Sequence, residues 1–179
     1  MPATILTKLE SIVEEIDRNG NADRLRLTVL KKWFGSPDRL RAFAAWLAGR
    51  ALARGRPRAT GEARVLFDEA HALLSAPGVA EQGLGFSAAR DLYFRLKAFQ
   101  NEHKRLEWGA VRQIRDWDLV LIEEALAICV AIRPTPASGY QLAADYCVHY
   151  SSGYGAGLNG PARERVQEII AFIRAYEGG

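Results

Sequence analysis

Arginines are concentrated in the segment Arg54-Gly-Arg-Pro-Arg58, and Arg50 precedes it by about one helical turn. Exposed arginines can neutralise the phosphates of a nucleic acid or attract another acidic partner. The surrounding residues 18–64 carry 12 lysines and arginines against three acidic residues, so this part of the chain is strongly basic. Nucleic-acid binding through Arg50, Arg54, Arg56 and Arg58 is therefore an alternative function. The simpler interpretation is a solvated, helix-favouring surface.

A carboxylate at the start of a strongly apolar segment is the second chemical candidate. Asp118 falls on the inward side of the expected helix, and a buried carboxylate needs a partner. Arg112, Arg115 or an arginine from elsewhere could supply it. His103 lies in the apolar stripe of the preceding helix, so we expect His103 and Asp118 as buried polar groups that form a pair. A structural ion pair is favoured over catalysis, and a small-molecule-binding or hydrolytic pocket near these residues is the second alternative.

Tyrosines and glycines gather in one loop near the end of the chain. We predict an interaction loop from this composition, because Tyr-, Gly- and Ser-rich segments form adaptable contact surfaces. Its members are Tyr140, Tyr150, Tyr154, Gly155 and Gly157. The alternative is that the rings fill the core beneath the loop.

The same glycines match the pattern G-x-G-x-x-G, which brings backbone N–H groups close to a pyrophosphate. Only 19 residues follow Gly160, which leaves no room for the second strand that a dinucleotide site requires. The three histidines lack the helical spacing of zinc ligands. Cys147 and His149 would share a face only in a strand. We therefore predict no catalytic residue, no metal and no cofactor.

Helices must position all of these groups, because apolar residues recur at gaps of three and four and no segment alternates convincingly as a strand. The segment 114–132 is apolar nearly all round, so it should lie at the centre. The sequence predicts an all-α fold, a seven- or eight-helix bundle around this buried helix, in one domain spanning residues 1–179. The other expected helices lie at about 3–18, 22–34, 37–51, 60–74, 87–106, 138–150 and from 159 onward.

The composition excludes some classes of protein. Hydrophobic residues make up 49% of the chain and charged residues 25%, which is typical of a globular protein. The longest nearly apolar run, 119–132, is too short to cross a bilayer, and the start of the chain lacks the features of a signal peptide. With only two cysteines, we expect a cytoplasmic protein, and its abundant arginine suggests a bacterial high-GC genome.

One function is favoured over the others by three features of the sequence, namely the lack of a catalytic motif, the four tryptophans and the tyrosine loop. We expect a non-catalytic helical protein that acts through protein–protein contacts, by self-association or with a partner protein. Nucleic-acid binding is the alternative, and no association with membranes is expected.

Overall fold

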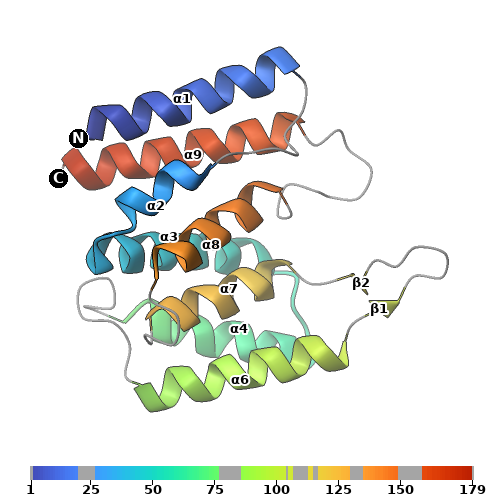
Figure 1. Cartoon of the computed structure of the whole chain (residues 1–179). Coiled ribbons are helices and arrows are strands. Elements are labelled where there is room, and N and C mark those ends of the chain that lie inside the picture. The colour runs from blue at the N-terminus through green and yellow to red at the C-terminus, as the bar shows by residue number, and fades with distance from the viewer. Residues whose placement is uncertain are drawn as a thin grey trace. The chain divides into compact units, whose positions relative to one another are not determined.

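The computed structural model describes residues 2–19, 27–76, 86–103, 105–106, 113–114, 117–129, 135–148 and 159–178. Eight α-helices lie among these residues, and the two strands are only two residues long (Figure 1). The predicted all-α fold is therefore confirmed. None of the described helices combines the length and the apolar character that crossing a membrane requires.

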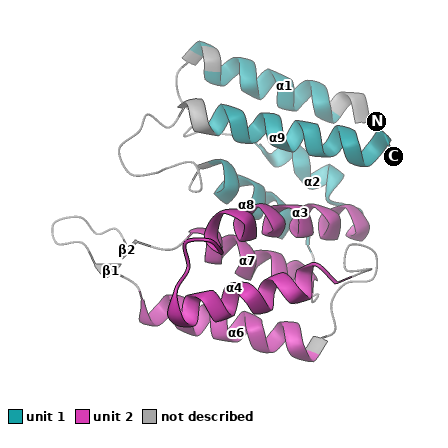
Figure 2. Ribbon diagram, turned by 180° about the vertical axis from the view of Figure 1, so that it is seen from behind, with its two compact units in different colours: residues 1–36, 135–179 teal, residues 37–134 magenta. Residues whose placement is uncertain are grey.

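The chain divides into two compact units (Figure 2). Unit 1 joins the two ends of the chain, Met1–Ser36 and Thr135–Gly179, and unit 2 is the continuous segment Pro37–Pro134. The expectation of one domain for residues 1–179 stays a prediction.

Unit 1 is built on two long helices that lie side by side and antiparallel, α1 and α9 (Figure 1). Helix α8 packs against α9 and against the short helix α2. The elements of this unit are α1 (Pro2–Asn19), the 3-10 helix η1 (Leu27–Val29), α2 (Leu30–Trp33), α8 (Pro136–Val148) and α9 (Asn159–Gly178).

An aromatic cluster fills part of the core of unit 1. The Trp33 side chain is 1% exposed, and its ring lies edge-on to Phe34, Phe172 and Tyr176, with centroids 5.4, 6.1 and 5.7 Å away. Its Nε1 donates a hydrogen bond to Glu177 Oε1 at 2.8 Å. Trp33 therefore belongs to the core, so this one of the four tryptophans does not support a role in binding a partner.

Unit 2 is organised around helix α7, which packs against α3 and α6. Ten of the 13 residues of α7 are buried, as the prediction of a buried central helix requires. Helix α4 packs against α3 and α6. The elements of this unit are α3 (Pro37–Gly55), α4 (Gly61–Leu74), α6 (Phe86–Glu102), β1 (Arg105–Leu106), β2 (Gln113–Ile114) and α7 (Trp117–Cys129).

Several element assignments differ from the sequence prediction; residues 27–29 of the expected helix 22–34, for example, form the 3-10 helix η1. Helix α6 ends at Glu102, earlier than expected, and the backbone N and the ring Nδ1 of the next residue, His103, both donate to the Phe99 carbonyl, at 3.0 and 2.9 Å. Ile114 lies in β2, where it pairs with β1, so α7 begins later than expected. Helix α8 begins at Pro136, two residues before the expected start at 138, and it is preceded by Thr135, whose Oγ1 accepts a hydrogen bond from the Ser138 N–H at 3.2 Å.

Candidate functional site

The predicted basic segment forms a tight turn where α3 ends. Backbone N–H groups of Arg56 and Arg58 donate to the carbonyls of Leu52 and Gly55, both at 3.0 Å. Pro57 lacks an N–H group and cannot continue the helical ladder. The turn therefore directs its arginine side chains to positions that a continuing helix would not give them.

Asp118 is the buried carboxylate that the sequence predicts, with a side chain 3% exposed. The Arg58 guanidinium donates a hydrogen bond to its Oδ2, and Arg54 Nε lies 3.9 Å from the same oxygen. Arg112 and Arg115, suggested as partners, lie outside the described residues. The basic turn and the buried aspartate, which the sequence presents as separate candidates, form one ion-pair cluster.

Gly55 allows this cluster to form. A Cβ atom at this position would lie 2.4 Å from Cζ of Phe67 and 3.0 Å from Cβ of Asp118. Both neighbours are buried, so neither can move away easily. The end of α3 can therefore approach Phe67 and Asp118 only because residue 55 has no side chain.

A second ion-pair cluster surrounds Asp68 of α4. Arg56 Nε donates to Asp68 Oδ1 at 2.6 Å, and Arg64 Nε lies 3.1 Å from Oδ2. These hydrogen bonds, first from Arg56 and then from Arg64, hold the pKa of the Asp68 carboxyl below its ordinary value. Two guanidinium groups share one carboxylate here, so the cluster retains one excess positive charge.

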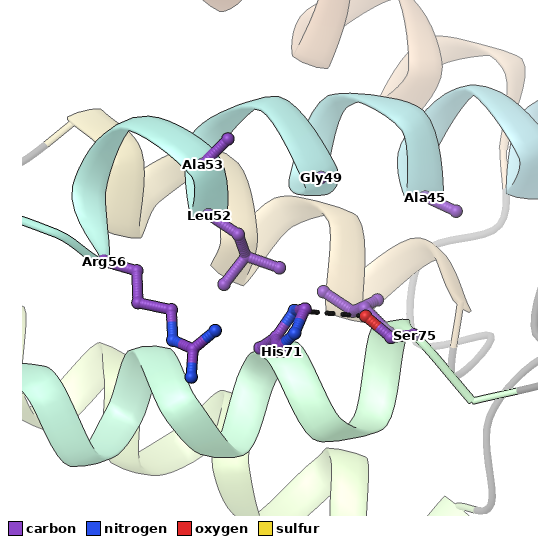
Figure 3. Close-up of a pocket in the computed structure, with 8 residues that line it drawn as sticks. Ala45, Gly49, Leu52, Ala53, Arg56, His71 and Ser75 are labelled. Atoms are coloured by element: carbon purple, nitrogen blue, oxygen red, sulfur yellow. Dashed lines mark hydrogen bonds between the residues drawn. The ribbon is translucent and has the colours of Figure 1, made fainter.

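A pocket of about 200 Å³ lies between α3 and α4 (Figure 3). Gly49 and Leu52 form part of its α3 side, and Arg56 and His71 project into the space between the helices. His71 Nδ1 lies 3.1 Å from Ser75 Oγ, so these two side chains form a hydrogen-bonded pair at the pocket. The pocket was not predicted, although the four-residue spacing of His71 and Ser75 was an available signal.

The predicted pair of His103 and Asp118 is wrong. His103 is exposed at the end of α6, where its ring stacks on Phe99 with centroids 4.0 Å apart. The apolar stripe suggested burial for His103, but α6 ends just before it and no longer holds it against the core. Asp118 instead contacts Arg54 in the last turn of α3 and Arg58 in the turn that follows it.

Most of the predicted interaction loop lies outside the described residues, namely Tyr150, Tyr154, Gly155 and Gly157. Tyr140 is described and half-buried, with Lys31 Nζ 4.9 Å from the centre of its ring. The loop therefore stays a prediction.

A partly buried cluster in unit 1 joins α8 to α9. The hydroxyl of Tyr146, a fully buried residue, donates to Glu168 Oε2, and Arg165 Nη1 contacts that carboxylate at 2.9 Å and the hydroxyl at 3.2 Å. The guanidinium also lies 5.2 Å from the centre of the Tyr146 ring. The hydroxyl, the carboxylate and the guanidinium contact one another, so this arrangement fits a structural connection between two helices.

The thiols of this protein are poor nucleophile candidates. Burial raises the pKa of Cys129 to about 12 and raises the pKa of Cys147 as well. A reactive cysteine needs the opposite shift, because the thiolate is the nucleophile. His149, considered with Cys147, lies outside the described residues, and no group of His, Cys, Asp and Glu in the described part of the chain is arranged to hold a metal.

Comparisons with known proteins identify no relative. No protein-family model matches the chain, and neither a curated protein nor a solved structure matches it significantly. A function must therefore be argued from the geometry of the described residues.

Proposed function

We propose that this chain is a non-catalytic helical protein that acts through protein–protein contacts, and that the outer surface of α6 takes part in them. The observation that supports this proposal is Phe94, whose side chain is 51% exposed. The Arg90 guanidinium lies 5.5 Å from the centre of its ring. Aromatic and arginine side chains are enriched at protein interfaces, where rings are buried and guanidinium groups form several hydrogen bonds.

The packing of α6 explains why Phe94 faces outward. Leu92, Tyr93 and Leu96 are buried, and Arg95 donates two hydrogen bonds to Glu69 of α4 at 2.6 and 3.1 Å. These contacts fix the rotation of α6, so Phe94 cannot turn inward without breaking them. We name Arg90, Phe94 and Lys97 the Phe94 surface.

The arginines of the nucleic-acid alternative contact groups within unit 2. Arg54 and Arg58 contact Asp118, and Arg56 contacts Asp68. Arg50 lies 5.6 Å from the centre of the Trp46 ring. Binding of phosphates by Arg54 and Arg58 would compete with their contacts to the buried Asp118, so the geometry of these two residues favours the protein-binding proposal. Salt-dependent binding to generic DNA or RNA remains the test of that alternative.

A cytoplasmic location is part of the same proposal. Cys129 and Cys147 are free buried thiols, which fits a reducing compartment.

Size-exclusion chromatography with light scattering tests the proposal, followed by affinity capture with the full chain as bait. Burying the exposed half of a phenylalanine contributes roughly 1 kcal/mol, so Phe94→Ser should weaken the assembly or the capture about fivefold. Val65→Ser, which removes an apolar side chain that is 49% exposed on α4 and not on α6, is the matched control and should change neither. A strict monomer that captures no protein contradicts the proposed function. If the assembly forms equally well with the Phe94→Ser variant, the contact does not involve the outer surface of α6.

A further inference from the structure

The pocket between α3 and α4 contains the features of a binding site for a small anion. We propose that it binds a small organic carboxylate, whose charged group contacts Arg56 and whose apolar body lies against Leu52 and Leu74. All three residues line the pocket. The proposal concerns a different surface from Phe94 and does not depend on the protein-binding function.

The charge of the pocket favours an anion. Arg56 and Arg64 share the single carboxylate of Asp68, which leaves one positive charge without an equivalent negative charge in this cluster. Within the described part of the chain, Arg56 contacts Asp68 through Nε alone, so its two terminal nitrogens can bind a ligand. These two nitrogens match the two oxygens of a carboxylate, which arginine binds in a bidentate manner.

The other polar groups stand opposite Arg56. His71 and Arg56 project into the pocket from facing elements, and Ser75 lies beside His71 (Figure 3). The hydrogen-bonded pair of His71 and Ser75 offers a hydroxyl and a ring nitrogen to a bound group. A few convergent polar groups beside apolar side chains are the usual composition of a small-molecule site.

Gly49 is the second observation that points to a ligand. It lies within α3 on the wall of the pocket, and a Cβ added there would meet no atom within 4 Å. Packing therefore does not require glycine at this position, although glycine weakens a helix relative to alanine. Gly49 therefore borders an open space that a side chain longer than a methyl group would fill.

The volume indicates how much of a ligand the pocket can hold. At about 30 Å³ for each water-sized group, 200 Å³ accommodates roughly seven such groups. This space fits the carboxylate and most of the body of a small aromatic or short-chain acid. Benzoate and hexanoate are therefore suitable probes, and acetate tests a carboxylate without an apolar body.

NMR titration of the full chain tests the proposal. Benzoate or hexanoate should shift the backbone amide signals of Gly49, His71 and Ser75 in a saturable manner, with a Kd on the order of 1 mM. Benzamide and acetate should bind at least about tenfold more weakly, because benzamide lacks the negative charge and acetate lacks the apolar body. The absence of saturable shifts with both acids up to about 20 mM overturns the proposal.

Two variants separate binding in the pocket from adventitious binding elsewhere. Gly49→Leu places a side chain in the open space, and Arg56→Gln removes the charge, so each should weaken binding at least about tenfold. Gly49→Ala adds one methyl group and should stay within about threefold of the wild type. Ala98→Leu, a similar enlargement on exposed α6, should have no effect. Unchanged binding by Gly49→Leu, with the fold intact by circular dichroism, overturns the proposal.

Discussion

Two glycines of α3 occupy opposite environments. Gly55, at the end of the helix, is buried, and an added Cβ would lie 2.4 Å from the Phe67 ring. Gly49 is exposed, and an added Cβ would meet nothing within 4 Å. Packing explains the first glycine and does not explain the second. The role of a glycine within a helix can therefore be assigned only when its neighbours in the fold are known.

The two glycines also mark two different arrangements of arginine. Near Gly55, Arg58 neutralises the buried carboxylate of Asp118. Near Gly49, Arg56 pairs with Asp68, which is half-exposed, and also lines a pocket. One end of α3 is thus closed by packing, and the adjoining region is open to solvent.

The largest effect is expected at the closed end. Gly55→Ala should destabilise the protein by about 2–3 kcal/mol, since the new methyl group overlaps the buried Phe67 ring and contacts Asp118. Urea denaturation followed by circular dichroism measures this loss. A Gly55→Ala variant as stable as the wild type would show that the contact at this end is looser than described.

The next effect tests the ion pair at the same end. Asp118→Asn should cost about 1–2 kcal/mol, because the buried group loses its charge-assisted hydrogen bond while Arg58 remains more than half exposed to water. The loss should decrease in high salt. Asp68→Asn is the control, since Asp68 is half-exposed and should matter less. Equal losses for the two variants would contradict the distinction between the closed and open regions.

A gain in stability is expected on the open side. Gly49→Ala should stabilise the protein by about 0.5–1 kcal/mol, because alanine is the better helix former and its methyl group meets no neighbour. The same denaturation experiment measures this gain. A loss of stability would show that the added methyl group meets a neighbouring atom, so that Gly49 and Gly55 would not differ in their surroundings.

The sequence predicts the helices well because they depend on local patterns. The apolar character of the segment after Asp118 identifies α7 as buried, and the position of Asp118 on the helix indicates that its carboxylate faces inward. Its partner could not be predicted, since Arg58 is 60 residues away and reaches Asp118 only through the packing of α3 on α7. The pairing of His103 failed because periodicity does not fix where a helix ends.

The pocket is harder to predict from the sequence than the partner of Asp118. The spacing of His71 and Ser75 indicates that these two side chains can meet on one helix. Nothing local indicates that Arg56 faces them from another element, or that Gly49 borders an open space while Gly55 does not. These properties arise from the packing of α3 on α4, which depends on contacts distant in sequence.

The smallest expected effect on stability concerns Asp68, whose partner Arg56 connects its cluster to the open pocket. Hydrogen bonds from Arg56 and Arg64 hold the pKa of its carboxyl below the ordinary value, so the contribution of Asp68 to stability is present above the ordinary pKa and is lost as the pH falls through the lowered pKa. NMR titration of the carboxyl carbon measures this pKa directly. Arg56→Gln should raise it more than Arg64→Gln, because the hydrogen bond from Arg56 contributes most to the shift. The reverse order would mean that Arg56 spends less time on Asp68 and more of it directed toward the pocket.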